Sequence, residues 1–312
     1  MSAVTVVIPL YNKGQCIGRA LDSIFRQTFQ NFEVVVVDGG SEDDGPEVVF
    51  RYGDPRVRFL LQEGKGVSSA RNQGIQAARS SFVAFLDADD EWLPGHLQTL
   101  LELRERYPKA GAYAAAWKVC STGGNIERIT LRRVPPPPWE GLLPSYFTAA
   151  PLSYQPVWTS AVGIPKHVLK EIGCFPPSIS IGEDLITWFK IALRYPIAFT
   201  WRIGAIYHME AENRTAKEAN SRLWEEDLLD IVREIIRTDG VPADITHDVQ
   251  EFIAGYQITI ASKALSLGDP YRAQRALQEC STRLFRRERM KYMLIASLPP
   301  PLLRSFFAWK KR

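Results

Sequence analysis

The sequence predicts an α/β fold: a mostly parallel sheet covered by helices on both faces, followed by an all-helical region. In the first hundred residues, four short apolar runs of strand length alternate with amphipathic, helix-like stretches. Strands that are apolar throughout belong to sheets whose two faces are both buried. From residue 214 onward the periodicity becomes almost entirely helical, so we expect a boundary near residue 213.

The parallel part of the sheet is expected to come from the first hundred residues. We predict strands and helices, in chain order, at residues 4–10, 13–25, 34–37, 57–61, 67–78, 81–86 and 94–107. Polar residues follow three of these strands, at residues 9–12, 38–41 and 87–90. Because ligands of such sheets bind at the carboxyl ends of the strands, these three segments are predicted to share one rim.

The middle of the chain is less regular. After a strand at residues 112–119, the stretch 134–156 contains four consecutive prolines, which exclude a central strand or helix. This stretch is either a loop that contacts an acceptor or a surface spacer. Order returns at residues 157–162, and a helix begins at residue 183. Two strands are expected at 197–201 and 205–207, followed by helices broken near residues 238–240, 268–270 and 299–301.

Composition narrows the class of protein. The chain has 312 residues with 38 basic and 35 acidic side chains, and this near balance gives no reason to expect a nucleic acid partner. Its four cysteines lack metal-ligand spacing, which favours reduced thiols in a cytosolic compartment. Neither a signal peptide nor a membrane-spanning run is present in the sequence. We therefore expect a cytoplasmic protein.

Four acids lie within five positions directly after the predicted strand at residues 81–86: Asp87, Asp89, Asp90 and Glu91. Carboxylates this close repel one another unless a cation holds them, and hard oxygen ligands suit Mg²⁺ or Mn²⁺. A solvated acidic turn is the alternative. The strand that precedes the acids favours a site.

The last residues, 299–312, combine leucines and aromatic side chains with a basic terminal cluster. This composition is typical of a segment that lies on a membrane surface. A helix that caps the core would have a similar composition, and both interpretations stay open. The first of them places the protein at the inner face of the membrane.

Five segments in order make the chain resemble the family 2 glycosyltransferases of the GT-A fold. They are residues 7–12, 37–41, 66–72, 86–90 and 182–184, and the resemblance covers roughly residues 3–210. It implies a GT-A catalytic domain over residues 1–213 and a helical region over 214–312. The implied reaction moves a sugar from a nucleotide diphosphate donor, with inversion, to a hydroxyl of a glycan, a lipid-linked molecule or another acceptor.

The resemblance also implies a metal site for Mn²⁺ or Mg²⁺. It makes Asp89 the direct ligand, turns Asp87 toward the donor ribose, and has Asp90 support the site from behind, although the division among the three stays open. His208 matches the family's late histidine, which completes the metal or phosphate site. A packing role is the alternative for this histidine.

Inversion needs one displacement, in which a base takes the proton of the attacking hydroxyl. The resemblance gives this role to Asp184, with Glu183 beside it in the catalytic set. A raised pKa would suit Asp184 to the task. Both acids lie at a predicted helix start, so helix capping is the alternative reading.

Nucleoside recognition is implied for Pro9, Tyr11, Asp38 and Arg71. Tyr11 offers an aromatic face to the base, Asp38 accepts from its imide N–H, and Arg71 approaches the base or the phosphates. The alternative for Arg71 is a surface position. The family usually has a second acid after Asp38, where this chain has Gly39. Asp38 reaches the base, a backbone carbonyl does, or the donor is not a uridine nucleotide.

A second hypothesis belongs to a different class: a non-catalytic, glycosyltransferase-like nucleotide-binding scaffold that recruits a partner through its helical tail. The missing acid at Gly39 motivates it. The retained pair of Glu183 and Asp184 and the retained acids of residues 87–90 argue against it, because a scaffold has no chemical need for them. Among the tryptophans and phenylalanines, Trp92 is the one expected to line the donor or acceptor site, because it follows the acids.

Overall fold

The computed structural model describes residues 2–210 and 223–299. The chain divides into two compact units. The first unit comprises residues 1–146 and 155–214, and the second comprises residues 147–154 and 215–312. The sequence did not indicate that residues 147–154 group with the helical part. Of the predicted membrane-surface segment, only Pro299 lies within the described residues.

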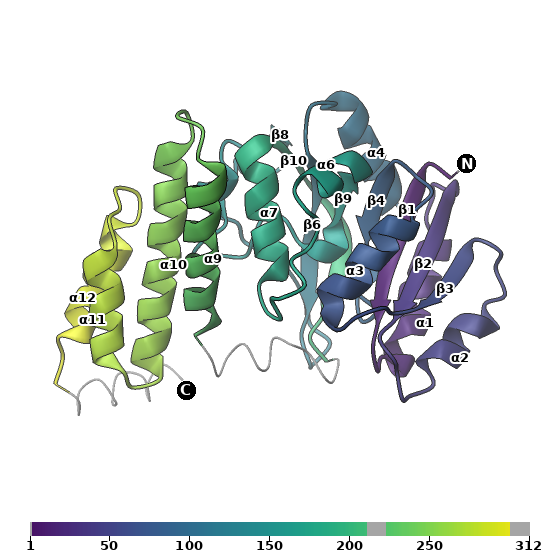
Figure 1. Ribbon diagram of the computed structural model, residues 1–312, viewed down its shortest axis with the longest axis horizontal. Coiled ribbons are helices and arrows are strands. Elements are labelled where there is room, and N and C mark those ends of the chain that lie inside the picture. Colours follow the sequence, from purple (N-terminus) through teal and green to yellow (C-terminus); the bar gives the residue numbers. More distant parts are fainter. Residues whose placement is uncertain (1, 211–222, 300–312) are drawn as a thin grey trace. The chain divides into compact units, whose positions relative to one another are not determined.

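The first unit is built on a ten-stranded mixed sheet with the strand order β3-β2-β1-β4-β9-β6-β10-β5, with β7 paired to β6 and β8 to β10. The strands are β1 (Val4–Leu10), β2 (Phe32–Asp38), β3 (Val57–Leu61), β4 (Phe82–Phe85), β5 (Glu91–Trp92), β6 (Ala112–Cys120), β7 (Ile126–Arg128), β8 (Glu140–Leu142), β9 (Val162–Pro165) and β10 (Ile197–His208). Figure 1 shows β1 to β4 side by side, and the pairs among them are all parallel. This half of the sheet confirms the parallel arrangement expected from the apolar runs.

Helices cover both faces of the parallel strands. The helical elements of this part of the chain are α1 (Gly14–Phe25), α2 (Gly45–Arg51), α3 (Gly66–Ala77), α4 (His96–Arg106), α5 (Tyr146–Ala149), the 3₁₀ helix η1 (Thr159–Ala161), α6 (Lys166–Glu171) and α7 (Glu183–Arg194). Val34 and Val36 of β2 pack in one core cluster with residues of α1, whereas Val35 and Val37 pack with Ala70 of α3. Alternate residues of one strand thus bury opposite faces.

A close contact fixes α3 on the sheet. A Cβ atom at Gly74 of α3 would lie 2.3 Å from Cγ1 of Val7 in β1, which is shorter than any real contact. Only glycine lets the helix approach the strand this closely. Since α3 also carries Arg71, this contact positions a predicted site residue.

Two segments differ from the sequence predictions. The stretch 134–156 contains β8 and α5, so it is not wholly irregular. The two strands expected at 197–201 and 205–207 form one strand, β10, whose pairing with β6 continues across register shifts after Thr200 and Ile203. The residues of β10 before and after these shifts both pair with β6. The interruption of the apolar pattern between residues 201 and 205 therefore does not end the strand.

The second unit contains α9 (Trp224–Asp239), α10 (Thr246–Ser266), α11 (Pro270–Glu279) and α12 (Arg286–Ala296). In Figure 1, and in their contacts, successive helices pack beside one another. The predicted breaks at residues 238–240 and 268–270 coincide with helix ends. A further break at residues 280–285 was not predicted; there the buried Glu251 accepts hydrogen bonds from Thr282 and from backbone N–H groups. None of the described helices could cross a membrane.

All four cysteines are free thiols, as their spacing predicted.

Candidate active site

The polar strand ends predicted to share a rim lie together at the carboxyl edge of β1, β2 and β4. The backbone N–H of Asn12, after β1, donates to Oγ of Ser41, after β2, at 2.9 Å. Lys13 reaches the third strand end, where its Nζ lies 2.8 Å from Oδ2 of Asp89. The backbone of Asn12 has a positive φ of 50°, a conformation that residues other than glycine seldom adopt. The rim is therefore cross-linked by side chains from three strands.

Asp38 ends β2 but does not project into the rim. Its side chain is 3% exposed and accepts hydrogen bonds from Ser41 Oγ at 2.6 Å and from the N–H groups of Gly40 and Ser41 at 3.2 Å. The turn that follows β2 thus occupies this carboxylate. Pro9 lies opposite Val37 in the β1–β2 register, at the same edge.

Gly39 is closely packed, although the family usually has an acid there. A Cβ atom at Gly39 would lie 2.9 Å from Oε1 of Gln62 and 3.4 Å from Cδ2 of Tyr11. Gln62 follows β3, and its Nε2 donates to the Gly66 carbonyl at 2.9 Å. The Tyr11 ring is 59% exposed. An amide and an exposed aromatic ring therefore flank the position where the acid is missing.

The aspartates of the acidic turn have separate partners. Each accepts a hydrogen bond from a different element: Asp87 from Arg71 at 2.8 Å, Asp89 from Lys13 at 2.8 Å and Asp90 from Ser160 at 2.5 Å. Within residues 2–210 and 223–299, no three His, Cys, Asp or Glu side chains are grouped to hold a metal ion by themselves.

Asp90 is the most deeply buried of these acids, at 1% exposure. Besides Ser160, Nε1 of Trp158 and the backbone N–H of His208 donate to it, at 3.3 and 3.4 Å. Burial, with the charges of Asp89 and Asp87, raises the pKa of Asp90 well above its usual value. Asp90 thus ties the acidic turn to η1 and to the end of β10.

Arg71 joins the acidic turn to α7. Its guanidinium donates from Nη2 to Asp87 and from Nη1 to Glu183, both at 2.8 Å, and lies over the ring of Phe175. Burial alone would lower the pKa of Arg71, but the charges of Asp87 and Glu183 raise it above its usual value. At 3% exposure, Arg71 is not the surface residue that the alternative reading allowed.

Asp184 lies in the first turn of α7, after Gly182, whose φ of 83° turns the chain into the helix. Its Oδ1 accepts from the N–H of Leu185 at 2.8 Å, and its Oδ2 lies 3.4 Å from Thr159 Oγ1. One carboxylate oxygen thus bonds to the helix start, as the capping alternative expected, while the other faces η1.

Burial raises the pKa of Asp184 to about 7. The charge of Glu183, beside it, adds to the increase, whereas the Arg71 guanidinium and the Leu185 N–H lower it, and Asp87 raises it slightly. A carboxylate with a pKa near neutrality is able to accept a proton during a reaction and release it afterwards. Asp184 therefore has the protonation behaviour that a general base needs.

His208 ends β10 and is 7% exposed. Its Nε2 lies 3.2 Å from Oε2 of Glu91, and its Nδ1 lies 3.5 Å from Oε1 of Glu210. Since its backbone N–H also bonds to Asp90, the structure does bring this histidine to the acidic turn.

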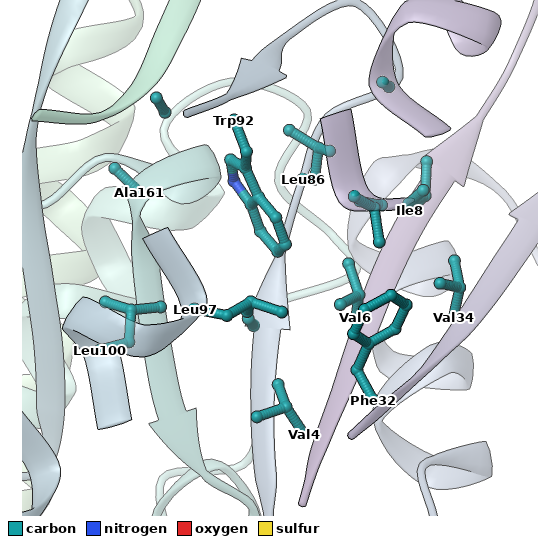
Figure 2. Close-up of a cluster of buried hydrophobic side chains, with 14 of the residues drawn as sticks. Val4, Val6, Ile8, Phe32, Val34, Leu86, Trp92, Leu97, Leu100 and Ala161 are labelled. Atoms are coloured by element: carbon teal, nitrogen blue, oxygen red, sulfur yellow. The ribbon is translucent and has the colours of Figure 1, made fainter. Parts of the chain in front are cut away.

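The prediction that Trp92 lines the site is wrong. Its side chain is 2% exposed, and Nε1 donates to the Ser160 carbonyl at 2.6 Å. Figure 2 shows the indole among Leu86, Leu97 and other core side chains. Directly after Asp90, the residues Glu91 and Trp92 form the short strand β5. This strand pairs with β10, and the pairing directs Trp92 inward.

Sequence reasoning missed four side chains of the site: Lys13, Gln62, Thr159 and Ser160. Lys13 and Gln62 stand next to apolar runs, at a helix start and after a strand, whereas Thr159 and Ser160 lie within the ordered stretch 157–162, in η1. Gln62 alone carried a usable signal, because it follows β3, the one strand of the parallel set whose end the rim argument left out.

The exposed acids fit a cation that is shared with phosphate groups. Mg²⁺ in such sites is bound by one or two carboxylates and takes its other ligands from phosphates and water. The side chains of Asp87 and Asp89 are 25% and 15% exposed, whereas Asp90 is enclosed by protein donors. The donor set therefore suits a metal–diphosphate and not a metal held by protein alone.

The chain resembles glycosyltransferases of several bacteria. It is 26% identical to an uncharacterized glycosyltransferase of Rickettsia conorii over 251 residues, 77% of this chain and 40% of that protein. It is 39% identical to an uncharacterized glycosyltransferase of Escherichia coli over 102 residues, 32% of this chain and 30% of that protein. The chain spans between 26% and 40% of the length of three Rickettsia relatives.

Solved structures share the fold. Residues 1–349 of TarS from S. aureus, in complex with UDP-GlcNAc, match with a TM-score of 0.67 and 22% identity, over 89% of this chain and 80% of that one. A mannosyltransferase from Pyrobaculum calidifontis, in complex with GDP-Man and Mn²⁺, matches with a TM-score of 0.59 and 21% identity, over 98% and 83%. Residues 5–158 match the family described as Glycosyl transferase family 2. The match to glycosyltransferase family 2 thus covers residues 5–158, and the chain has the GT-A fold of these solved structures.

Proposed function

We propose that the protein transfers a sugar from a nucleotide diphosphate donor to an acceptor hydroxyl in one inverting displacement, with Asp184 as the general base. The observation that carries this proposal is the network from the acidic turn through Arg71 to the start of α7. Asp87, Arg71 and Glu183 are linked in it by hydrogen bonds, and Asp184, whose carboxyl group has a pKa of about 7, lies next to Glu183. The nucleotide sugars bound by TarS and by the mannosyltransferase support a donor of this class.

The nucleoside would lie against the exposed ring of Tyr11, over the closely packed Gly39. Because the Asp38 carboxylate is hydrogen-bonded within its own turn, the Gln62 amide beside Gly39 would meet the edge of the base in its place. An amide offers both a donor and an acceptor. This pairing suits a uracil edge and a purine edge alike, so Gly39 does not commit the site to a uridine nucleotide.

The diphosphate would lie at the acidic turn. Asp89 and Asp87 would hold a Mn²⁺ or Mg²⁺ ion together with the phosphates, and this ion would neutralise the charge that develops on the leaving nucleotide. Lys13 and Arg71 bring fixed positive charge to the same two carboxylates. Asp90 holds the turn from behind through Ser160, in line with the supporting role that the resemblance gave it.

Asp184 would take the proton of the acceptor hydroxyl as the bond to the sugar forms. Thr159 and the Leu185 N–H orient its carboxylate, while the neighbouring Glu183 accepts a hydrogen bond from Arg71 through Oε1. A single base is enough for inversion. The acceptor is a hydroxyl compound, for which a glycan or a lipid-linked sugar is our proposal.

Titration calorimetry tests the proposal. Nucleoside diphosphates would be titrated into the protein with and without Mn²⁺, and release of nucleotide would be followed over a panel of donor sugars. We expect metal-dependent binding of at least one diphosphate and turnover of its sugar. Binding without any turnover would instead favour the non-catalytic scaffold, and no binding at all would contradict both hypotheses.

A further inference from the structure

Helix α12 exposes a cluster of bulky apolar side chains on one side. Met290, Met293 and Leu294 are 60%, 43% and 68% exposed, whereas Ile295 and Ala296 are buried in the second unit. Residues at spacings of three and four lie on one face of a helix. Single exposed apolar residues are ordinary, but three contiguous ones indicate a contact surface. We call these three residues the α12 face.

Basic side chains border this face. Between residues 283 and 291 the chain has five basic residues and a single acid, a net charge of +4. Arg286 and Arg287 are exposed and lie one turn before Met290, on the same side of the helix, and Lys291 is exposed at its edge. Long basic side chains are able to rest their methylene groups on apolar surroundings while the charge stays in water.

The charge decides which partner fits the α12 face. A second copy would bring the same charge of +4 against this one. Residues 300–312 of the chain contain Arg304 and a terminal Lys310-Lys311-Arg312 but no acid, so they too would be repelled. A lipid surface with anionic headgroups offers negative charge around the arginines and hydrocarbon for the methionines and leucine.

We propose that α12 binds the surface of a membrane rich in anionic phospholipid, lying in its interface with the α12 face inward. A membrane-surface segment was one of the two interpretations of residues 299–312; the exposure of Met290 and Leu294 instead favours a contact within the described helix that precedes them. This inference does not depend on the proposed sugar transfer.

Co-sedimentation with lipid vesicles tests the inference on the full chain. We expect binding to vesicles of phosphatidylcholine with phosphatidylglycerol, and not to phosphatidylcholine alone. The double substitution Met290→Gln and Leu294→Gln should lower the partition coefficient at least about tenfold, because buried apolar area drives insertion. The double substitution Arg286→Gln and Arg287→Gln should lower it about fivefold for each arginine and weaken its dependence on salt.

Controls come from the same unit. Leu267 and Tyr271 are 53% and 83% exposed outside α12, and changing each to Gln should leave vesicle binding unchanged. Circular dichroism would check that every variant is folded. If the variant with Met290→Gln and Leu294→Gln is unfolded, the vesicle binding of the variant with Arg286→Gln and Arg287→Gln tests the inference.

Three results would overturn the inference. The first is a failure of the wild-type protein to bind the anionic vesicles, and the second is binding of both α12 variants at the wild-type level. The third is loss of binding on changing Phe306 and Trp309 to Ser in a chain whose α12 variants bind normally, because the terminal residues would then be the anchor. Light scattering would show whether the α12 substitutions change the oligomeric state instead.

Discussion

At the scale of single residues, the candidate site contains two neighbouring acids with different surroundings. Glu183 and Asp184 are adjacent in α7, but Glu183 is paired with Arg71 whereas Asp184 faces a threonine hydroxyl. Burial, with the charge of Glu183 beside it, raises the pKa of Asp184 to about 7. Two like residues thus acquire different chemistry from their partners.

The raised pKa of Asp184 predicts how stability depends on pH. An unfolded aspartate ionises near pH 3.9, so from about pH 4 to about pH 7 the folded state holds a proton that the unfolded state has lost. The free energy of unfolding therefore falls as the pH rises through this range. Asp184→Asn, which has no charge to bury, should raise the melting temperature above wild type, and by more at about pH 8 than at about pH 5.5.

Calorimetric melting curves at the two pH values give this comparison. A difference between variant and wild type that is the same at both would show that Asp184 has an ordinary pKa. In the wild type, the rate of transfer should also fall below about pH 7, because the protonated carboxyl cannot accept the proton of the acceptor.

Ser160 is a second residue whose effect follows from its contacts. Its hydroxyl donates to the buried Asp90 and accepts from the N–H of Asp87. Ser160→Ala should lower the free energy of unfolding by about 1–3 kcal/mol, because a buried carboxyl loses a partner. Ser266→Ala, which removes an exposed hydroxyl in α10, should change it by less than about 0.5 kcal/mol. Urea unfolding measures both, and equal effects would contradict the role given to Ser160.

At the scale of elements, α3 and η1 position the site, and neither supplies the predicted base. The helix α3 holds Arg71 between Asp87 and Glu183, and η1 contacts the acidic turn through Ser160 and Asp184 through Thr159. Small displacements of either element would therefore disturb both ends of the site.

The contact of α3 with β1 gives a direct test. Gly74→Ala would place a methyl group against Val7 and force α3 away from the sheet. We expect a loss of about 1–3 kcal/mol in unfolding free energy from overpacking, together with weaker donor binding, because Arg71 moves with the helix. Gly95→Ala is the matched control, since a Cβ there meets no atom within 4 Å. Equal behaviour of the two variants in urea unfolding would contradict this account.

The end of β3 makes a prediction about the donor base. Gln62→Ala should lower the affinity for the nucleoside diphosphate about two- to tenfold, the worth of one or two hydrogen bonds. Gln76→Ala, at an exposed position of α3, should have no effect. If calorimetry shows unchanged affinity for the Gln62 variant, another group reads the base.

Sequence reasoning succeeded for those elements whose pattern reflects burial. The apolar runs located β1, β2 and β4 because both faces of these strands are buried, and they located β3 although this edge strand is only partly buried. The shared rim followed from the parallel order of the strands. It failed where a contact from elsewhere in the chain decides the outcome. Trp92 follows the acids in sequence, yet pairing of β5 with β10 turns it inward. Asp38 has the expected position at the end of β2, but its carboxylate accepts a hydrogen bond from Ser41 and does not face the predicted base site.

At the scale of the whole molecule, the two units carry separate proposals. The first unit contains every residue of the candidate active site, and the second contains the α12 face. A result against membrane binding would leave the proposed transfer untouched, and the reverse also holds. The match to the glycosyltransferase family covers residues 5–158, most of which belong to the first unit. The comparison therefore bears on the candidate active site and not on the α12 face.

The most direct test of the central claim is release of nucleoside diphosphate from a panel of donor sugars, measured with Mn²⁺ for the wild type and for Asp184→Asn. We expect turnover of at least one donor by the wild type, and a loss of roughly 10²- to 10⁴-fold in the variant, the scale on which a positioned base contributes. Calorimetry should show that the variant still binds the diphosphate. Equal turnover by the two proteins would remove Asp184 from the mechanism.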